Sequence, residues 1–232
     1  MSLTRRELIL LGFAAACASA DPPEKLRVRP NTRRSIGPGL HALELERRAL
    51  LYVPQNSRAF ALVLHGANGS PDRMIERLGS QADEFGVILL APKSEGMTWD
   101  AIRRRFGPDV LFLNNALGAA FARCSFDPKL LAVSGFSDGA TYALAIGLAN
   151  GDLFSHIAAF SPGFLIPVQR LGTPRFFLSH GTHDDVLPID HASRPIARDL
   201  GRMNLSVKLR EFDGGHILPP EIVREAFQWL SG

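Results

Sequence analysis

Residues from three distant parts of the sequence have the types and the order that nucleophilic catalysis requires. Ser137 lies in the string Gly-Phe-Ser-Asp-Gly, two aspartates follow in "SHGTHDD" (Asp184 and Asp185), and His216 lies in "DGGHILPP". A serine hydroxyl is a weak nucleophile until a histidine accepts its proton and a carboxylate orients that histidine. If the fold brings these side chains together, they could cleave an ester or an amide by acyl transfer.

The surroundings of Ser137 predict the sharp turn that exposes a nucleophile. An apolar strand over 129–136 precedes the serine, and a helix follows it. Gly135 and Gly139 have no Cβ to collide where the chain reverses closely around the serine. The first turn of the helix leaves main-chain N–H groups unpaired at its positive dipole end. We therefore expect the N–H of Asp138 to be one donor of an oxyanion hole.

The loop after an earlier strand is the predicted source of the second oxyanion donor. The apolar run 59–66 ends in Gly66, whose missing side chain lets the main chain approach a substrate. The N–H of Ala67 is the expected donor, with that of Asn68 as the alternative. His65 is expected to support this loop by hydrogen bonding and not to act as a base.

The acid and the base both follow predicted strands. The two aspartates come directly after the strand at 174–181, and His216 follows the strand at 206–212. Ligands bind an open parallel sheet at the carboxyl ends of its strands, so these groups are expected to converge there. Asp213 is a rival acid, but it is too close in sequence to His216 to orient the imidazole easily.

Strands and helices alternate along residues 40–232, which predicts a single domain with a mostly parallel sheet and helices on both faces. Residues 40–54 are typical of an edge or antiparallel strand pair, and 93–107 of a long irregular loop. Only about a dozen residues separate the strands at 154–163 and 174–181, too few for a helical lid. The other expected strands lie at 59–66, 87–92, 129–136 and 206–212, and the expected helices at 71–86, 108–124, 137–150, 189–203 and 220–230.

These motifs resemble those of the α/β-hydrolase superfamily over nearly all of residues 40–232. The strings "LHGANGS", "GFSDGATYALAIGLANGDLFSHIAAFSPG", "SHGTHDDVLPI" and "GGHILPP" are similar to those of serine esterases in the phospholipase/carboxylesterase and polyhydroxybutyrate-depolymerase-like groups. The resemblance implies an α/β-hydrolase fold and cleavage of carboxylic esters without a cofactor. It also implies that Asp184, the fifth residue of an HGxxD string, is the acid, and that Asp185 replaces a position often held by proline.

The same resemblance includes a tryptophan ahead of the Ser137 helix. Trp99 in "GMTWD" matches that residue, and Asp100 is expected to brace the loop. We expect Met97, Trp99 and Phe136 to form the apolar wall of the substrate pocket. Without a lid the site is open, which favours small-molecule esters with short or accessible acyl groups.

Two other functions remain open from the residues alone. A peptidase or amidase would use the same triad, because ester and amide hydrolysis share these residue types. A non-catalytic exported binding protein could keep the fold without turnover, although the complete set of serine, acid and histidine disfavours it. Assays with both substrate types and labelling of Ser137 by a fluorophosphonate distinguish the three functions.

Composition argues against several classes of partner and cofactor. The 232-residue chain carries a formal charge of +3, with 46% hydrophobic and 21% charged residues, which are ordinary values for a globular domain. Basic residues are scattered, apart from Arg33-Arg34 and Arg103-Arg104-Arg105, so no nucleic-acid surface is indicated. The histidines lack metal-ligand spacing and no dinucleotide motif follows a strand, so we expect neither a metal nor a cofactor. Cys124 is expected to be a buried thiol without a disulfide partner.

Residues 1–20 have the features of an export signal. Arg5-Arg6 precede an apolar run of about ten residues, as in a twin-arginine signal. The string "ASA" at 18–20 fits cleavage by signal peptidase, whereas "AAAC" resembles a lipobox in which Cys17 would carry lipid. We therefore expect an exported protein, periplasmic or secreted, that contacts a membrane only if Cys17 is lipidated. Residues 21–39 are predicted to form a linker.

Overall fold

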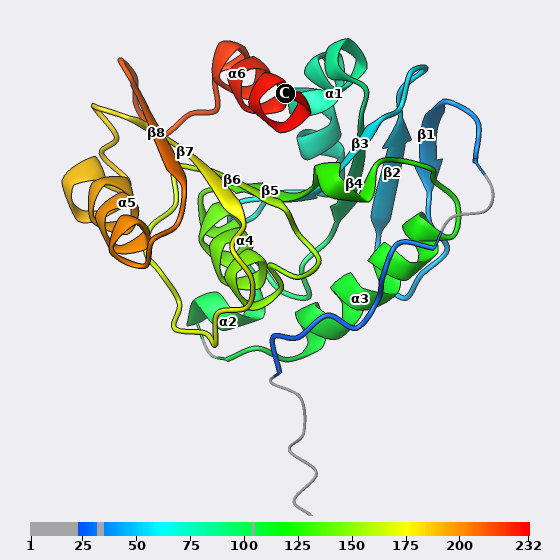
Figure 1. Cartoon of the computed structure of the whole chain (residues 1–232), viewed down its shortest axis with the longest axis horizontal. Helices are drawn as coiled ribbons and strands as arrows, with labels where there is room; N and C mark the ends of the chain where they lie inside the picture. The colour runs from blue at the N-terminus through cyan, green and yellow to red at the C-terminus, as the bar shows by residue number, and fades with distance from the viewer. Residues whose placement is uncertain (1–22, 32–34, 104) are drawn as a thin grey trace, which may run out of the picture.

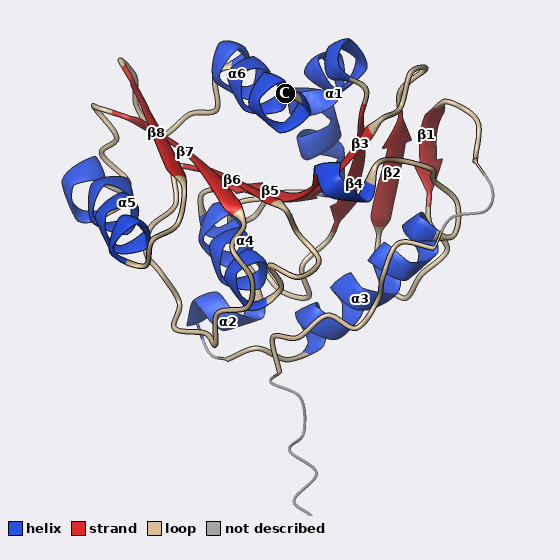
Figure 2. Cartoon of the chain, in the orientation of Figure 1, coloured by secondary structure: helices blue, strands red, loops and turns tan. Residues whose placement is uncertain are grey.

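The computed structural model describes residues 23–31, 35–103 and 105–232. Across these residues an eight-stranded sheet has the order β1-β2-β4-β3-β5-β6-β7-β8, with helices on both sides (Figure 1 and Figure 2). The strands are β1 (Gly39–Ala42), β2 (Ala49–Val53), β3 (Ala59–Leu64), β4 (Val87–Pro92), β5 (Leu131–Phe136), β6 (His156–Phe160), β7 (Arg175–Gly181) and β8 (Val207–Phe212). The helices are α1 (Pro71–Phe85), α2 (Asp100–Arg103), α3 (Pro108–Phe121), α4 (Asp138–Ala149), α5 (Ser193–Arg202) and α6 (Pro220–Ser231), with short 3₁₀ turns η1 (Pro128–Leu130) and η2 (Ile189–His191).

The strand directions confirm the predicted mostly parallel sheet. β1 pairs antiparallel with β2, and β2 pairs antiparallel with β4. From β4 through β3 and β5 to β8, every neighbouring pair is parallel. The carboxyl ends of these six strands therefore meet at one edge of the sheet, where the loops that carry the predicted functional residues begin.

Side chains of the central strands alternate between two cores. In β3, Phe60 and Leu62 belong to the core that includes residues of α3, α4 and α5, whereas Ala61 and Val63 belong to the core that includes α1 and α6. Figure 1 shows the same division, with α1 and α6 on one side of the sheet and α3 and α4 on the other. A strand buried on both faces needs the continuous apolar sequence that predicted it.

Local sequence signals set the helix boundaries closely. The side chain of Ser70 accepts a hydrogen bond from the main-chain N–H of Arg73, and Pro71 begins α1. Gly86 ends this helix with a left-handed φ of 66°, a conformation that glycine adopts without steric cost. Among the described residues of 93–107, a stretch predicted to be irregular, the only helix is the four-residue α2.

The connection between β6 and β7 contains no helix, as its length predicted. Leu165, Ile166 and Val168 of this connection pack, partly buried, against the main core, so the connection lies on the domain and does not form a helical lid.

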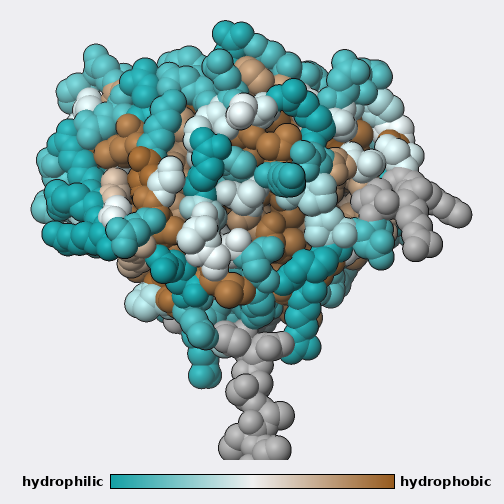
Figure 3. All heavy atoms as spheres, in the orientation of Figure 1, coloured by the Kyte–Doolittle hydropathy of each residue, from teal (hydrophilic) through white to brown (hydrophobic). Residues whose placement is uncertain are grey.

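In the part of the chain that the structure describes, no helix is long and apolar enough to span a bilayer. Figure 3 shows a face with hydrophilic side chains along most of its outline and hydrophobic patches nearer its centre.

Part of the predicted linker is attached to the domain. The main-chain N–H of Leu26 donates to the Asn150 side chain at 2.7 Å, the Asn150 amide donates to the carbonyl of Glu24, and Leu26 is fully buried. Lys25 forms an ion pair with Asp152 at 2.7 Å. This attachment is hard to predict from sequence because it depends on one apolar side chain and one buried amide. The predicted export signal, including Arg5-Arg6 and Cys17, lies outside the described residues, as do Arg33, Arg34 and Arg104.

Candidate active site

Ser137 occupies a strained turn between β5 and α4. Its φ is 57° and its ψ is −123°, and its N–H donates to the carbonyl of Phe160 at 2.9 Å. A positive φ is uncommon for a residue with a side chain and costs free energy that the surrounding structure must supply. The turn leaves the serine side chain at the carboxyl edge of the sheet, as the strand-turn-helix pattern predicted.

Close main-chain approaches explain the two glycines around Ser137. A Cβ at Gly135 would lie 2.2 Å from the carbonyl oxygen of Gly139, and a Cβ at Gly139 would lie 2.2 Å from that of Leu64. Both distances are far shorter than van der Waals contact, so no residue with a side chain fits either position without moving the main chain. The predicted steric role of the glycines is confirmed.

Ser137, His216 and Asp184 form a continuous chain of hydrogen bonds. His216 Nε2 lies 2.9 Å from Ser137 Oγ, and His216 Nδ1 lies 2.6 Å from Asp184 Oδ2. The carboxylate can only accept, so Nδ1 carries the proton that it donates and Nε2 is left to accept from the serine hydroxyl. The Asp184 side chain is fully buried, whereas 15% of the His216 side chain is exposed.

The surroundings of Asp184 keep it ionised and oriented. Burial by itself would raise the pKa of Asp184, but the Leu187 N–H and the hydrogen bond from His216 outweigh it and hold the pKa below its ordinary value. Asp184 Oδ1 accepts from the N–H groups of Val186 at 3.0 Å and Leu187 at 2.8 Å. His180 Nε2 lies 3.1 Å from Oδ2. The carboxylate therefore has fixed donors on both oxygens.

Neither rival acid takes the place of Asp184. Asp185 is exposed at the surface. Asp213 pairs with His183 at 3.0 Å, and 92% of the Asp213 side chain is exposed. Among the hydrogen bonds of the described residues, neither carboxylate reaches His216. Of the aspartates left open by the residues alone, the structure brings only Asp184 to the histidine.

Two main-chain N–H groups near Ser137 have no acceptor within the described chain. These are the N–H of Ala67, in the loop after β3, and that of Asp138, the first residue of α4. The N–H of Asn68, the alternative donor, already donates to the carbonyl of Met97 at 2.7 Å. The pair Ala67 and Asp138 is thus available to a negatively charged oxygen beside the serine.

Trp99 braces the loop after β3 and does not line the cavity beside Ser137. Its side chain is fully buried, its indole N–H donates to the His65 carbonyl at 2.8 Å, and its ring stacks on Tyr142 with 5.3 Å between centroids. Trp99 therefore does not form a wall of the cavity beside Ser137. Whether an aromatic side chain faces a cavity or the core depends on its packing partner, here Tyr142, which the local pattern does not reveal.

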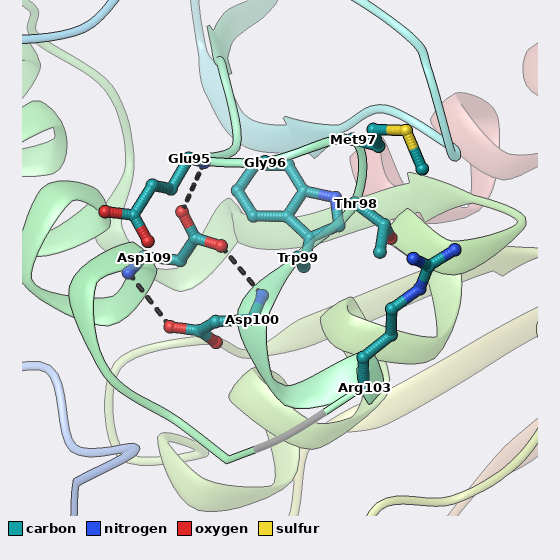
Figure 4. A pocket seen from close by; sticks show the side chains of 8 residues that line it. All are labelled: Glu95, Gly96, Met97, Thr98, Trp99, Asp100, Arg103 and Asp109. Carbon is teal, nitrogen blue, oxygen red and sulfur yellow. Dashed lines mark hydrogen bonds between the residues drawn. The ribbon is translucent and has the colours of Figure 1, made fainter.

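Met97 is likewise not among the residues that line the cavity beside Ser137. It lines a different cavity of about 230 Å³ together with Trp99, Asp100 and Asp109 (Figure 4). The buried carboxylate of Asp109 accepts from the N–H groups of Glu95 and Asp100, both at 2.8 Å. Asp100 in turn accepts from the N–H of Gly107 at 2.9 Å, which confirms its predicted bracing role. These hydrogen bonds hold the main chain of loop 93–107 in place, so the residues around this second cavity have a structural role.

The cavity beside Ser137 is small. Its volume is about 290 Å³, and its lining includes residues of the loop after β3, the first turns of α1, Val186 and His216. Phe136 lines this cavity, as predicted, with its ring centroid 4.9 Å from that of His216. A cavity of this size lies at the lower end of the range for small-molecule sites, roughly 300–1,000 Å³.

His65 supports the loop after β3, as predicted. Its Nδ1 lies 2.7 Å from the Gly66 carbonyl, so it donates there, and its Nε2 accepts from the N–H of Ser94 at 3.1 Å. Burial lowers the pKa of His65, which favours the neutral ring. Both nitrogens are therefore occupied by structural hydrogen bonds.

In the described part of the chain, neither Cys124 nor a metal site adds a second reactive centre. Cys124 is buried without a disulfide partner, and burial raises the pKa of its thiol to about 11. A thiol with that pKa is protonated and unreactive at neutral pH. In residues 23–31, 35–103 and 105–232, no cluster of histidine, cysteine and acidic side chains could hold a metal ion.

Sequence reasoning missed four residues around the site. His180 contacts Asp184, and the hydroxyl of Thr98 donates to Asp138 at 2.6 Å. Arg73 and Arg77 of α1 line the cavity beside Ser137. The spacing of His180 four residues before the acid, and of the two arginines on one helical face, were the available signals.

Comparisons with known proteins bear on the fold. No family model matches the chain. It is 28% identical over 147 residues to "Putative esterase NocK" of Nocardia uniformis subsp. tsuyamanensis, an alignment that covers 59% of this chain and 43% of NocK. The matched part is therefore less than half of the NocK sequence.

Solved structures match most of the chain. Esterase PE8 gives a TM-score of 0.64 at 22% identity, covering 83% of this chain and 98% of PE8. The Bacillus cereus carboxylesterase gives 0.62 at 17% identity, covering 81% and 94%. The S-formylglutathione hydrolase FrmB of Staphylococcus aureus gives 0.67 at 12% identity, covering 83% and 98%. With its sheet order and its strand-turn-helix at Ser137, the chain has the α/β-hydrolase fold.

Proposed function

We propose that the protein is a serine hydrolase that cleaves carboxylic esters through an acyl-enzyme on Ser137. The observation that carries this proposal is the hydrogen-bonded chain from Ser137 Oγ through His216 to the buried carboxylate of Asp184. The strained turn at the serine and the two free N–H groups beside it support the same chemistry.

In the first half of the proposed reaction, Ser137 attacks the ester carbonyl and His216 Nε2 accepts the hydroxyl proton. The tetrahedral oxyanion binds to the N–H groups of Ala67 and Asp138, which need no reorganisation because the loop and the helix hold them. His216 then protonates the departing alcohol. Asp184 keeps the proton on Nδ1 and stabilises the imidazolium that forms.

In the second half, His216 accepts a proton from a water molecule that attacks the acyl group on Ser137. Collapse of the second tetrahedral intermediate releases the carboxylic acid and returns the proton to the serine oxygen. The same N–H groups stabilise both intermediates. No step requires a metal or a cofactor.

Short acyl groups are the proposed substrates. The cavity beside Ser137 has a volume of about 290 Å³, and the connection between β6 and β7 places no helix over it. A series of 4-nitrophenyl esters from acetate to laurate tests this preference. We expect kcat/KM to be highest for the short esters, and a maximum at laurate would contradict the proposed size limit.

A matched pair of variants tests whether Ser137 is the nucleophile. Ser137→Ala should lower kcat by about 10⁴- to 10⁶-fold, because residual turnover then comes only from binding and oxyanion stabilisation. Ser206→Ala, which removes an exposed hydroxyl, should retain wild-type turnover. Equal turnover by both variants would rule out the acyl-enzyme on Ser137.

Amide substrates separate esterase from peptidase activity. The same triad can attack an amide, whose poorer leaving group requires protonation by His216. We expect hydrolysis of 4-nitrophenyl esters and little release of 4-nitroaniline from the matching anilides. Faster release from the anilides would favour the amidase function, and absence of both would favour a binding role.

We also propose that the protein acts outside the cytoplasm. This proposal rests on the sequence of residues 1–20, with its arginine pair and short apolar run. Fractionation of cells that express the full chain should recover the protein outside the cytoplasm, and Arg5→Lys/Arg6→Lys should retain it inside. Lipid on Cys17 would appear as a mass increase that Cys17→Ala abolishes.

A further inference from the structure

Two arginines of α1 line the same cavity as Ser137 and His216. Arg73 and Arg77 are four residues apart, so they lie on one face of the helix. Two like charges in this arrangement repel each other. Neither arginine takes part in the proposed steps of ester hydrolysis.

Neither arginine has a carboxylate partner in the described part of the chain. Among the ion pairs within 4 Å there, none includes Arg73 or Arg77, although the exposed side chains of Arg48, Arg210 and Arg224 have such partners. Arg48 pairs with Asp72 of the same helix at 2.5 Å. Glu76 lies between the two arginines in sequence, yet its carboxylate forms no ion pair within 4 Å with either of them.

Arg77 lies over the ring of Phe136, which precedes Ser137. Its guanidinium lies 5.6 Å from the ring centroid of Phe136, the residue before Ser137. The Phe136 ring in turn lies 4.9 Å from that of His216. Because the cavity holds only about 290 Å³, a substituent bound by the arginines would be a short distance from an ester bound at Ser137.

The other charges near this wall do not cancel the arginines. The ammonium of Lys93 donates to the carbonyl of Gly69 in the loop before α1, at 3.0 Å. Asp72 pairs with Arg48, and the Asp138 carboxylate accepts a hydrogen bond from the Thr98 hydroxyl. The cavity wall formed by α1 is therefore positively charged.

We propose that Arg73 and Arg77 bind an anionic substituent of the substrate, such as a carboxylate, and so select half-esters of dicarboxylic acids or esters of hydroxy acids. Guanidinium groups bind planar oxyanions through paired, charge-assisted hydrogen bonds. This assignment rests on the proposed ester hydrolysis and names the class of ester.

Two matched substrate pairs test the proposal. In the first, 4-nitrophenyl hydrogen adipate carries the charge on the acid, and its methyl ester is the neutral partner. In the second, 4-acetoxybenzoate carries the charge on the alcohol, and its methyl ester is again neutral. The wild type should prefer the anionic member of at least one pair by about tenfold or more in kcat/KM, and high salt should reduce that preference.

The arginine variants show whether α1 causes the preference. Arg73→Gln/Arg77→Gln should lower the ratio of anionic to neutral kcat/KM by about tenfold or more, mainly through KM, and Arg73→Lys/Arg77→Lys should retain part of it. Arg198→Gln removes an exposed charge from α5 and should leave the ratio unchanged. An unchanged ratio in the double glutamine variant, or a wild type that prefers both neutral esters, would overturn the anion site while leaving the ester hydrolase intact.

A binding measurement separates this failure from failure of the proposed function. In the Ser137→Ala background, calorimetry with 4-acetamidobenzoate reports anion binding without turnover. Adding Arg73→Gln/Arg77→Gln should weaken binding by about tenfold or more. Equal affinity in the two proteins would overturn the anion site even if no ester were hydrolysed.

Discussion

The loops after β7 and β8 carry two aspartate–histidine pairs that cross between them. Asp184 of the first loop pairs with His216 of the second at 2.6 Å, and Asp213 of the second pairs with His183 of the first at 3.0 Å. The exposed fractions of the side chains are 0% and 15% in the first pair and 92% and 74% in the second.

Burial and additional hydrogen-bond donors, more than residue type, distinguish the pair that can orient a catalytic imidazole from the pair that cannot. The exposed pair is surrounded by water, which screens its attraction and allows many side-chain conformations. The buried pair is held by the N–H groups of Val186 and Leu187 and by His180. Only the buried pair can keep an imidazole aligned with a hydroxyl.

The largest expected difference between the pairs concerns turnover. Asp184→Asn should lower kcat for a short 4-nitrophenyl ester by about 10³- to 10⁴-fold. The Val186 and Leu187 N–H groups would hold the amide oxygen, so the amide NH₂ would donate to Nδ1 and favour the wrong imidazole tautomer. Asp213→Asn is the matched control, with the same change on the exposed pair. The kcat of Asp213→Asn should stay within about twofold of the wild type. Similar losses of kcat in the two variants would contradict a special role for the buried pair.

A smaller effect is expected at the histidines that flank Asp184. His180 is buried between Asp184, the Leu187 carbonyl and the Ser193 hydroxyl, and burial lowers its pKa, so it is neutral. His180→Asn should lower kcat about tenfold by loosening the carboxylate. His183→Asn changes an exposed ring and should have little effect.

Separate kcat and KM values test whether His180 positions the acid. Its Nε2 donates to the Leu187 carbonyl and lies 3.1 Å from Asp184 Oδ2, so the loss of the ring should lower kcat more than it raises KM. A change confined to KM would contradict positioning of Asp184 by His180.

The smallest expected effect is on stability at acid pH. The folded-state pKa of Asp184 is lowered, so its ionised form stabilises the fold above the ordinary pKa, and this contribution is lost as pH falls through the folded value. Denaturant unfolding should therefore show that the wild type and Asp184→Asn differ most above about pH 5. The difference should shrink as the pH falls toward 3. A difference that is independent of pH would contradict an ionised Asp184.

The triad could be located from the sequence because the signals that identify it are motifs of neighbouring residues and the order of the strands. The glycines around Ser137, the strand before it and the helix after it are local signals with a steric cause. The histidine follows the last strand, so the parallel sheet must bring it to the same edge as the serine. Among the aspartates, the residues alone left Asp184 and Asp185 open, and the resemblance to known hydrolases decided correctly which one contacts the histidine.

The parts of the site where the structure differs from the expectation depend on side-chain direction. Trp99 was expected to face the cavity, but its ring packs on Tyr142 and its indole binds a carbonyl. Arg73 and Arg77 were read only as part of a helix, because a charge on a helix gives no sign of which cavity it faces. Helix and strand positions follow from periodicity, whereas such directions follow from tertiary contacts between residues far apart in sequence.

Covalent labelling tests the central claim most directly. The purified protein is treated with a fluorophosphonate, its intact mass is measured, and the labelled peptide is sequenced, with Ser137→Ala and Asp184→Asn in parallel. We expect one label per chain on Ser137 in the wild type, much slower labelling of Asp184→Asn, and no labelling of Ser137→Ala. Absence of label on the wild type, or label on another residue that persists in Ser137→Ala, would contradict the central claim.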